Sequence, residues 1–345
     1  MDNPIMTQER THLASNIILT AAAAVIVIAG VKSAAAMLVP FLLAIFIAVI
    51  SAPLMRWLTS HKVPEVVSVL TLLCGFILVG TMLATFIGST LNSFYQDVPT
   101  YEAKLGGLVQ QVVTWLRDMG VQVADNIVAE YVNPGAVMKM VGTVFNGLGG
   151  VLTNTFLILF TVVFILLEAS SFPAKLKRAF GEQTTAFVQF ERFSNSVQQY
   201  LAIKSLVSLG TGATIGLILW IIGVDYFALW ALVAFLLNYI PNIGSIIAAI
   251  PAVLIALIQL GVGEAVLVGV SYVVVNTVFG NVVEPRLMGR SLGLSTLVVF
   301  LSLVFWGWVL GPVGMLLSIP LTMVMKIALE SRPQSRWIAT LLDHD

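Results

Sequence analysis

The apolar positions of this chain form long continuous runs, and few of them alternate with polar positions. A helix needs about 20 mostly apolar residues to cross the hydrocarbon core of a bilayer. Six runs come close to that length or exceed it, so the pattern predicts six full membrane spans. They cover about 15–31, 34–51, 66–91, 148–168, 201–222 and 262–282. Two further apolar stretches, 226–259 and 295–329, are longer than one span and contain helix-breaking residues.

The first broken stretch is interrupted at 238–245 by Asn-Tyr-Ile-Pro-Asn-Ile-Gly-Ser. Proline removes a backbone donor and clashes with the preceding turn, and glycine and asparagine weaken a helix further. The limb before the break has about 14 residues and reaches about 21 Å, which is less than a core about 30 Å thick. The stretch is therefore either one kinked, strongly tilted helix or a re-entrant hairpin that enters and leaves on the same side. The second stretch, broken at 311–314 by Gly-Pro-Val-Gly, presents the same choice.

The distribution of Lys and Arg favours hairpins at both places. Cytoplasmic segments collect basic residues, and the densest basic segment, 169–200, is therefore placed inside. With two hairpins, both termini are cytoplasmic, and 13 of the 17 basic residues fall inside or at the inner edge. The prediction is an all-α polytopic membrane protein with six full spans and two re-entrant helical hairpins, about eight membrane elements in total. The four basic residues placed elsewhere are Lys32, Lys104, Arg117 and Lys139.

The two broken stretches also resemble each other. In each, a glycine precedes the break proline by 18 or 19 residues, a second glycine follows the break, and an Ile-Pro pair comes later. Each follows a full span, and the two enter from opposite sides in this topology. The pattern predicts an inverted repeat of span plus broken hairpin. Secondary transporters use this plan, with the binding site near the midplane, where the broken backbones meet.

These elements divide the chain into five regions. The polar segment after the third run carries apolar residues at helical spacing from Leu105 to Met119, which predicts an amphipathic helix in an insert outside the membrane. The regions are 1–91, the N-terminal scaffold helices; 92–147, the extracytoplasmic helical insert; 148–200, a membrane helix and basic cytoplasmic loop; 201–330, the transport unit with both broken hairpins; and 331–345, a cytoplasmic tail.

Polar and ionisable groups inside a membrane are costly, and broken backbone there must line a cavity or be buried in protein. The amides near the first break could bind a substrate or cap the broken helix ends. Glu284 and Arg286, on either side of a proline, could pair with each other at the membrane interface. Lys204 and Gln259 are further possibilities, although for Lys204 we expect the ammonium group to extend to the interface. The candidate substrate-binding residues are Asn238, Pro241, Asn242, Gly244, Ser245, Asn276, Asn281, Glu284, Arg286, Pro312 and Gly314.

Composition narrows the class of protein further. Hydrophobic residues make up 59% of the chain and charged residues 10%, against about 25% charged in soluble domains. The zero net charge gives no indication of nucleic acid binding, and one cysteine and three separated histidines show no metal-site spacing. Phosphate-loop, metalloprotease and nucleophile-elbow motifs are missing, so neither an enzyme nor a cofactor is expected. Gly212 and Gly216 predict a face for close helix packing.

Four segments carry a resemblance to a known family. They are 238–251 (NYIPNIGSIIAAIP), 280–290 (GNVVEPRLMGR), 291–308 and 311–322 (GPVGMLLSIPLT). They resemble the autoinducer-2 exporter family, and the likeness extends over nearly the whole chain. The resemblance implies a secondary transporter of the bacterial inner membrane that exports autoinducer-2, a small polyhydroxylated quorum-sensing signal. It also implies a homo-oligomer, in particular a pentamer, and an elevator-like motion of the hairpin part against a scaffold.

Three functions remain open at this point. The first is export of a small uncharged signal that amide and hydroxyl groups bind at the hairpin tips. The second is sodium/proton antiport with Glu284 as the titrating group, because some relatives resemble such antiporters. The third is a membrane scaffold that transports nothing and binds a partner through its insert.

Overall fold

The computed structural model describes residues 22–120, 155–169, 185–241, 243–288, 294–330 and 336–342, with single positions at 19, 172, 175 and 178. All regular structure in these ranges is helical, as the apolar pattern predicts. After a first helix at Ala22–Ser33, the elements are α2 (Ala35–Ser60), α3 (Glu65–Asp118), α6 (Thr155–Ala169), α8 (Thr185–Ile222), α9 (Phe227–Leu237), α10 (Ile243–Gln259), α11 (Val262–Asn276), the π-helix η1 (Thr277–Val283), α12 (Glu284–Met288), α13 (Thr296–Leu316), α14 (Ser318–Glu330) and α15 (Arg336–Leu341).

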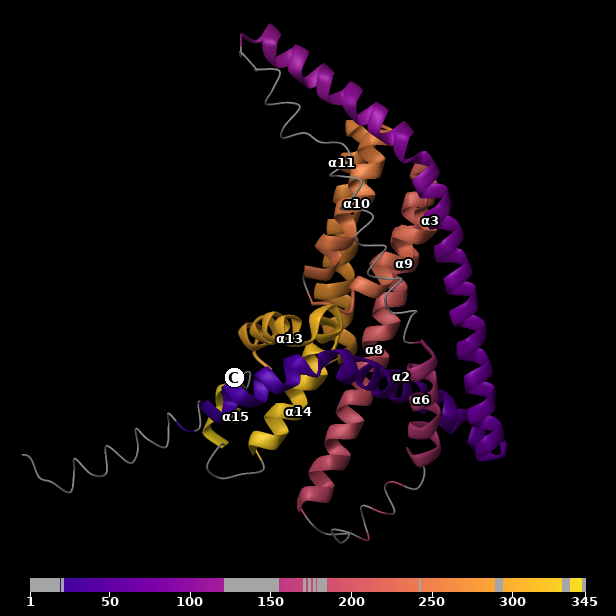
Figure 1. Ribbon diagram of the computed structural model, residues 1–345, viewed down its shortest axis with the longest axis vertical. Coiled ribbons are helices and arrows are strands. Elements are labelled where there is room, and N and C mark those ends of the chain that lie inside the picture. The colour runs from indigo at the N-terminus through magenta and orange to yellow at the C-terminus, as the bar shows by residue number, and fades with distance from the viewer. Residues whose placement is uncertain are drawn as a thin grey trace, which may run out of the picture.

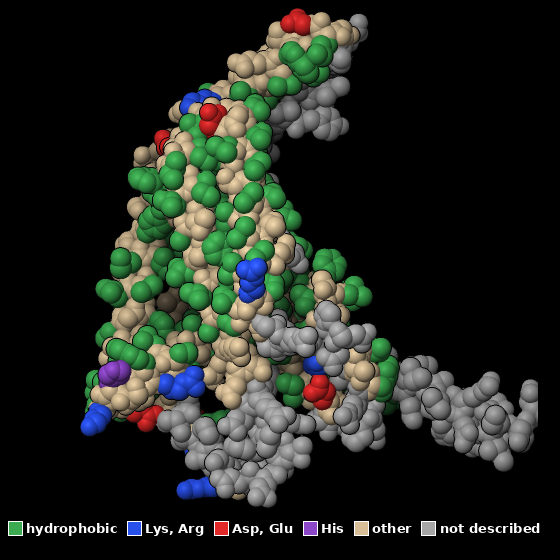
Figure 2. Space-filling model, turned by 180° about the vertical axis from the view of Figure 1, so that it is seen from behind, with side chains coloured by type: hydrophobic (Ala, Val, Ile, Leu, Met, Phe, Trp, Pro, Cys, Tyr) green, Lys and Arg blue, Asp and Glu red, His purple; other side chains and the backbone are tan. Residues whose placement is uncertain are grey.

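Five helices in the described ranges are long and apolar enough to cross a membrane. Figure 2 shows hydrophobic side chains covering the middle of one face, while most charged side chains gather toward its two ends. Side chains that face lipid have this distribution, so the expectation of a polytopic membrane protein is confirmed. The predicted runs at 15–31 and 148–168 begin outside the described residues. The five helices are Ala35–Ser60, Glu65–Asp118, Ser194–Ile222, Val262–Met288 and Thr296–Leu316.

Helix α3 differs from its prediction. The sequence pattern predicts a span that ends near 91 and a separate amphipathic helix after Pro99, but α3 is one helix of 54 residues with Pro99 inside it. A proline removes one donor, and a helix with strong helical pattern on both sides continues through it with a kink. At 1.5 Å per residue this helix is about 81 Å long. It runs along one side of the molecule and extends past the other helices (Figure 1).

The first broken stretch forms a helical hairpin, α9 and α10, with the break between Leu237 and Ile243 where the sequence predicts it. The hairpin packs on α8 and α11 beside the upper part of α3 (Figure 1). Leu229 and Trp230 of α9 and Ile255 of α10 are fully buried in the centre of this bundle. Burial of apolar side chains between these helices therefore positions the hairpin.

Hydrogen bonds fasten the open end of this hairpin. The Gln259 side chain accepts from the Asp225 backbone N–H at 2.8 Å and donates to the Gly223 carbonyl at 3.0 Å. Tyr226 has a φ of 59°, an uncommon left-handed value for a tyrosine, and its hydroxyl donates to the Asp97 carboxylate of α3. Burial raises the pKa of Tyr226, and Asp97 adds to the shift, so the hydroxyl stays protonated as a donor. The two ends of the stretch thus lie together, as a hairpin requires.

The second broken stretch also folds back on itself. Within α13 the helix is broken at Gly311, whose φ of 70° lies in the left-handed region that favours glycine. The Trp306 indole N–H donates to the Thr322 hydroxyl of α14 at 3.0 Å, which holds the limbs on either side of the break together. This hairpin packs on α2 and on the first part of α8.

The two breaks share one local geometry. A Cβ added at Gly244 would collide with the carbonyl oxygen of Leu237, and one added at Gly314 would collide with that of Trp306. In both hairpins a glycine just after the break therefore lies directly against a carbonyl of the first limb. This likeness supports the predicted internal repeat at the level of the two turns.

Candidate functional site

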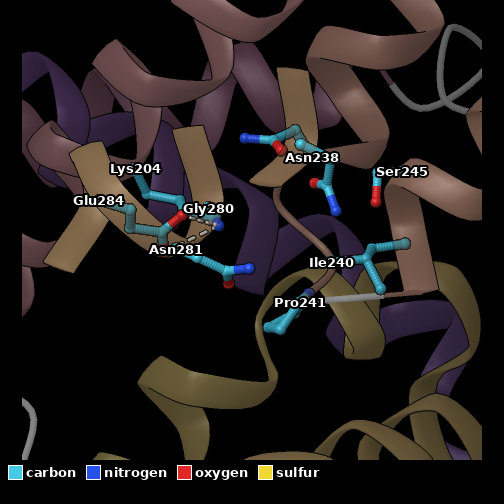
Figure 3. A pocket seen from close by; sticks show the side chains of 9 residues that line it. Lys204, Asn238, Ile240, Pro241, Ser245, Gly280, Asn281 and Glu284 are labelled. Carbon is cyan, nitrogen blue, oxygen red and sulfur yellow. Dashed lines mark hydrogen bonds and ion pairs between the residues drawn. The ribbon is translucent and has the colours of Figure 1, made fainter. Parts of the chain in front are cut away.

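A polar cavity of about 80 Å³ lies at the break between α9 and α10 (Figure 3). Three parts of the chain form its wall: α8, the break with the first turn of α10, and the segment from α11 through η1 to α12. The cavity thus combines one pair of opposite charges with amide and hydroxyl groups inside a helical bundle. Its lining residues are Lys204, Asn238, Ile240, Pro241, Ser245, Asn276, Gly280, Asn281 and Glu284.

The cavity lies where the chain leaves helical geometry for a few residues, between the end of α9 and the start of α10. The Ile240 N–H still donates to the Leu237 carbonyl at 2.9 Å, and the Gly244 N–H donates to Ile240 at 3.2 Å. Between these bonds lies Pro241, which has no N–H to donate. The end of α9 and the start of α10 both carry backbone groups without helical partners. The polar ends of two helices therefore meet at one wall of the cavity.

The π-helix η1 arranges the opposite wall. A π-helix bonds residue i to residue i+5, and such segments are frequent at functional sites. Its wider turn brings Asn276 and Asn281, which are five residues apart, to the same side of the cavity. Packing supports this segment, because a Cβ at Gly210 of α8 would lie 2.6 Å from Phe279. The absence of a side chain at Gly210 therefore lets Phe279 of η1 pack against α8.

An ion pair between Lys204 and Glu284 is the most polar feature of the cavity. The Lys204 ammonium nitrogen lies 2.9 Å from one carboxylate oxygen of Glu284 and 2.8 Å from the other. The Lys204 side chain is 5% exposed and that of Glu284 is 18% exposed. Glu284 across the cavity holds the Lys204 ammonium group, so Lys204 pairs with another helix of the bundle. Unpaired, either charge would have a high desolvation cost at this burial.

Polar side chains on α8 connect this pair to the hairpin tip. Asn238 is buried and donates from its amide to the Ser208 hydroxyl at 2.9 Å. The Tyr239 hydroxyl donates to the Ser205 hydroxyl at 2.8 Å. Lys204, Ser205 and Ser208 therefore form a polar stripe on α8 that faces the break.

The first limb of the hairpin lies very close to α8. A Cβ at Gly212 would be 2.8 Å from the Cβ of Phe235, and one at Gly216 would be 2.7 Å from the Cβ of Ala231. The prediction that Gly212 and Gly216 form a close-packing face is therefore confirmed. This contact sets the distance between α9 and the stripe of polar residues on α8.

Six of the eleven candidate residues line the cavity. Gly244 lies in the turn beside it, tightly packed against α9. Arg286 is exposed on α12 and is not part of the lining, which leaves Glu284 with Lys204 as its ion-pair partner. Pro312 and Gly314 belong to the second break and lie outside the cavity, and Asn242 is outside the described residues. The six lining residues are Asn238, Pro241, Ser245, Asn276, Asn281 and Glu284.

The sequence pattern missed the role of α8. Ser205 and Ser208 were not among the candidates, and Lys204 was a further possibility for which an interfacial position was favoured. One signal was available, because Lys204 and Ser208 are four residues apart and so share a face of an otherwise apolar helix. Gly280 was also missed, since a π-helix cannot be recognised from apolar periodicity.

Comparison with known proteins gives matches over nearly the whole chain. Residues 17–334 match the family model described as AI-2E family transporter. The AI-2 transport protein TqsA of Escherichia coli strain K12 is 42% identical over 318 residues, which cover 92% of each chain. A Haemophilus influenzae protein, named provisionally as a transport protein, is 42% identical over 327 residues, which cover 93% of this chain and 94% of that protein. YhhT of Escherichia coli strain K12, named in the same way, is 36% identical over 95% of this chain and 94% of its own length.

Proposed function

Because the chain belongs to the AI-2E family of transporters, we propose that it exports the quorum-sensing signal autoinducer-2 through the cavity at the α9–α10 break. Family membership confirms the resemblance found in the sequence and makes the protein a transporter. The named activity of TqsA, AI-2 transport, is the reason for choosing this cargo.

The ion pair of Lys204 and Glu284 beside a broken helix is the observation that supports a transport site here. Ionisable groups within membrane segments face cavities or each other and mark transport pathways. An interrupted helix within a membrane is tolerated where it lines such a cavity. A scaffold that transports nothing has no need of either feature. The polar cavity therefore speaks against the scaffold hypothesis.

The chemistry of the cavity favours a small uncharged polar cargo. Its two charges neutralise each other at 2.8 Å and 2.9 Å, which leaves the amides of Asn276 and Asn281 in the lining for hydrogen bonds to a cargo. Its volume, about 80 Å³, is well below the roughly 300–1,000 Å³ of pockets for drug-sized ligands. A small polyhydroxylated molecule fits this description, and its entry requires movement of the hairpin tip.

The depth of the cavity is consistent with uptake of cargo from the cytoplasm. On α8, Lys204 lies 18 residues before Ile222, or about 27 Å along a straight helix. The cavity therefore lies near the end of the span that is opposite the 223–226 loop. The repeat predicts a site near the midplane, but this position is closer to one face of the membrane. If both termini are cytoplasmic in the inner membrane, that face is the inner one. We propose in addition that the protein is a homo-oligomer, a pentamer as the family resemblance implies, and that the hairpin part moves in an elevator-like way.

Efflux of labelled autoinducer-2 from vesicles that contain the purified protein tests the proposal. The double variant Asn276→Ala/Asn281→Ala should lower the efflux rate about tenfold or more, because each lost hydrogen bond removes about 1 kcal/mol of binding. Asn195→Ala is the matched control, since Asn195 is an exposed asparagine of α8 outside the cavity. Wild-type efflux no faster than that of protein-free vesicles would refute autoinducer-2 export.

Sodium/proton antiport is the second candidate, and the Glu284 carboxylate in the cavity supports it. In that case a sodium gradient should drive proton flux through the wild-type protein, and Glu284→Gln should abolish that flux. Autoinducer-2 efflux without sodium-driven proton flux favours the exporter. Proton flux without autoinducer-2 efflux favours the antiporter.

A further inference from the structure

The contact between Lys204 and Glu284 occupies the place where a free cation would bind the carboxylate. The ammonium nitrogen lies at nearly equal distances, 2.9 Å and 2.8 Å, from the two carboxylate oxygens. With the Lys204 side chain only 5% exposed, the ammonium group has little water around it and depends on Glu284 as its partner. The cation that binds the carboxylate is therefore part of the protein, the ammonium group of the Lys204 side chain.

The surroundings of the pair supply no second counterion within the cavity. Tyr200 of α8 and Tyr239 at the break are tyrosines, whose hydroxyl groups carry no charge near pH 7. Arg286 is an exposed residue of α12 and is not part of the cavity lining. In the described part of the chain, α9 and η1 carry no charged residue. Charged side chains of the other elements packed on α8 lie outside the lining, namely Arg56 of α2, Glu264 of α11, and Lys326 and Glu330 of α14.

We infer that Lys204 is the built-in counterion of Glu284, which makes transport through this cavity independent of sodium and of membrane potential. This inference rests on the proposed function, since it specifies how the same cavity operates. The net charge of the described lining is zero, +1 from Lys204 and −1 from Glu284. A site without net charge that carries an uncharged cargo moves no charge through the membrane field.

Loss of the lysine charge alone is expected to create a cation requirement. Glu284 would then be a carboxylate in a poorly hydrated cavity without a partner, and such a group takes up a proton or another cation. Lys204→Met should therefore transport slowly at pH 8 and recover at pH 5.5, where protonation replaces the missing lysine. Lys204→Arg keeps the charge and should remain insensitive to pH over this range.

A purely structural ion pair predicts a different result. If the pair only holds α8 and α12 together, removal of either group damages transport equally at all pH values, and removal of both groups gives no recovery. Under the counterion inference, Lys204→Met/Glu284→Gln removes both charges together. At pH 8, the flux of Lys204→Met alone should be about tenfold or more below that of the wild type. The double variant should regain at least about a third of wild-type flux at the same pH.

The first measurement uses the wild-type protein in vesicles with labelled autoinducer-2. Flux should change less than about twofold when choline replaces sodium, or when a potassium gradient with valinomycin sets a potential of 100 mV. A sodium requirement, or a flux that follows the potential, would overturn the inference. So would a double variant as slow as Lys204→Met, provided that both elute as folded protein in size-exclusion chromatography.

A second measurement does not depend on the cargo. Carbodiimides modify protonated carboxyl groups in apolar surroundings, and peptide mass spectrometry reports modification at Glu284 itself. Labelling of Glu284 at pH 7 should be low in the wild type and in Lys204→Arg and should rise at least fivefold in Lys204→Met. Equal labelling in all three proteins would refute the counterion role. Absence of autoinducer-2 flux together with the expected labelling would refute only the proposed cargo.

Discussion

The two broken hairpins have nearly the same turn and very different surroundings. Each has a proline at the break and a following glycine pressed against a carbonyl of the first limb. The α9–α10 break faces Lys204, Asn276 and Glu284 across a polar cavity. The α13–α14 hairpin packs into an apolar cluster that includes Leu201 of α8 and Ile319 of α14. Its Trp306–Thr322 hydrogen bond joins the two limbs of the hairpin, and neither residue lines the cavity at the first break.

This difference shows that a break in a helix is insufficient to make a binding site. The turn supplies backbone groups without helical partners and some space, and both hairpins have these. The chemical groups come from the helices packed against the turn. At the first break these helices contribute an ion pair and two amides, whereas apolar side chains of α2 and α8 pack against the limbs of the second hairpin. A binding site therefore requires a break in a helix and, on the helices packed against that break, polar side chains that face it.

The largest expected effect concerns the buried pair at the first hairpin. Glu284→Ala leaves the Lys204 ammonium group buried without a partner, which should lower the free energy of unfolding by about 3–5 kcal/mol. The matched change at the second hairpin is Glu330→Ala, because Glu330 is 40% exposed and lies 3.8 Å from Lys326. Glu330 is partly exposed and the 3.8 Å contact is long, so its loss should cost about 1 kcal/mol or less. Unfolding in mixed micelles with increasing denaturing detergent measures both, and equal losses would contradict the comparison.

Substitution of the glycines at the two breaks should have similar effects on stability and different effects on function. Gly244→Ala and Gly314→Ala each place a methyl group against a backbone carbonyl, and such overpacking costs about 1–3 kcal/mol. Only Gly244→Ala should also slow autoinducer-2 efflux at a temperature where both variants are folded. Gly263→Ala on α11 is the control, since nothing lies within 4 Å of an added Cβ there. Equal loss of efflux in both break variants would mean that the second break also contributes to the site.

Loss of the hydrogen bonds at the open end of the first hairpin should have a smaller effect. Gln259→Ala removes the bonds to Asp225 and Gly223, and two such bonds together contribute about 1–3 kcal/mol. Hydrogen exchange of the α9 and α10 amides should become faster, while exchange in α13 and α14 stays unchanged. Faster exchange in all four helices would indicate that the hairpins open as one unit.

The smallest effects are expected from single hydrogen bonds in each hairpin. Ser208→Ala removes the acceptor for Asn238, and Thr322→Val removes the acceptor for Trp306. Each should cost about 0.6 kcal/mol, the average for such bonds inside membrane proteins. Only Ser208→Ala should weaken the apparent affinity for cargo, because Asn238 lines the cavity. A change of affinity in Thr322→Val would place the second hairpin in the binding pathway.

Sequence patterns located the breaks well because proline and glycine act on their own backbone. Helix α9 ends at Leu237, just before the predicted interruption at 238–245, and α10 begins within it at Ile243. Gly311 breaks α13 where expected. The same local logic was wrong at Pro99, where the helix continues. A proline costs one hydrogen bond, and strong helical pattern on both sides is enough to offset that loss.

The sequence by itself determined that the protein is helical, crosses a membrane and contains two interrupted helices. These properties depend on apolar run length and on local backbone chemistry, which neighbouring residues along the chain decide. Tertiary structure alone decided that Lys204 pairs with Glu284, 80 residues away, and that one break faces polar helices while the other faces apolar ones. Which charge neutralises which depends on how helices distant in sequence pack together. Apolar periodicity does not encode those distances, because the close approach at Gly210, Gly212 and Gly216 sets them.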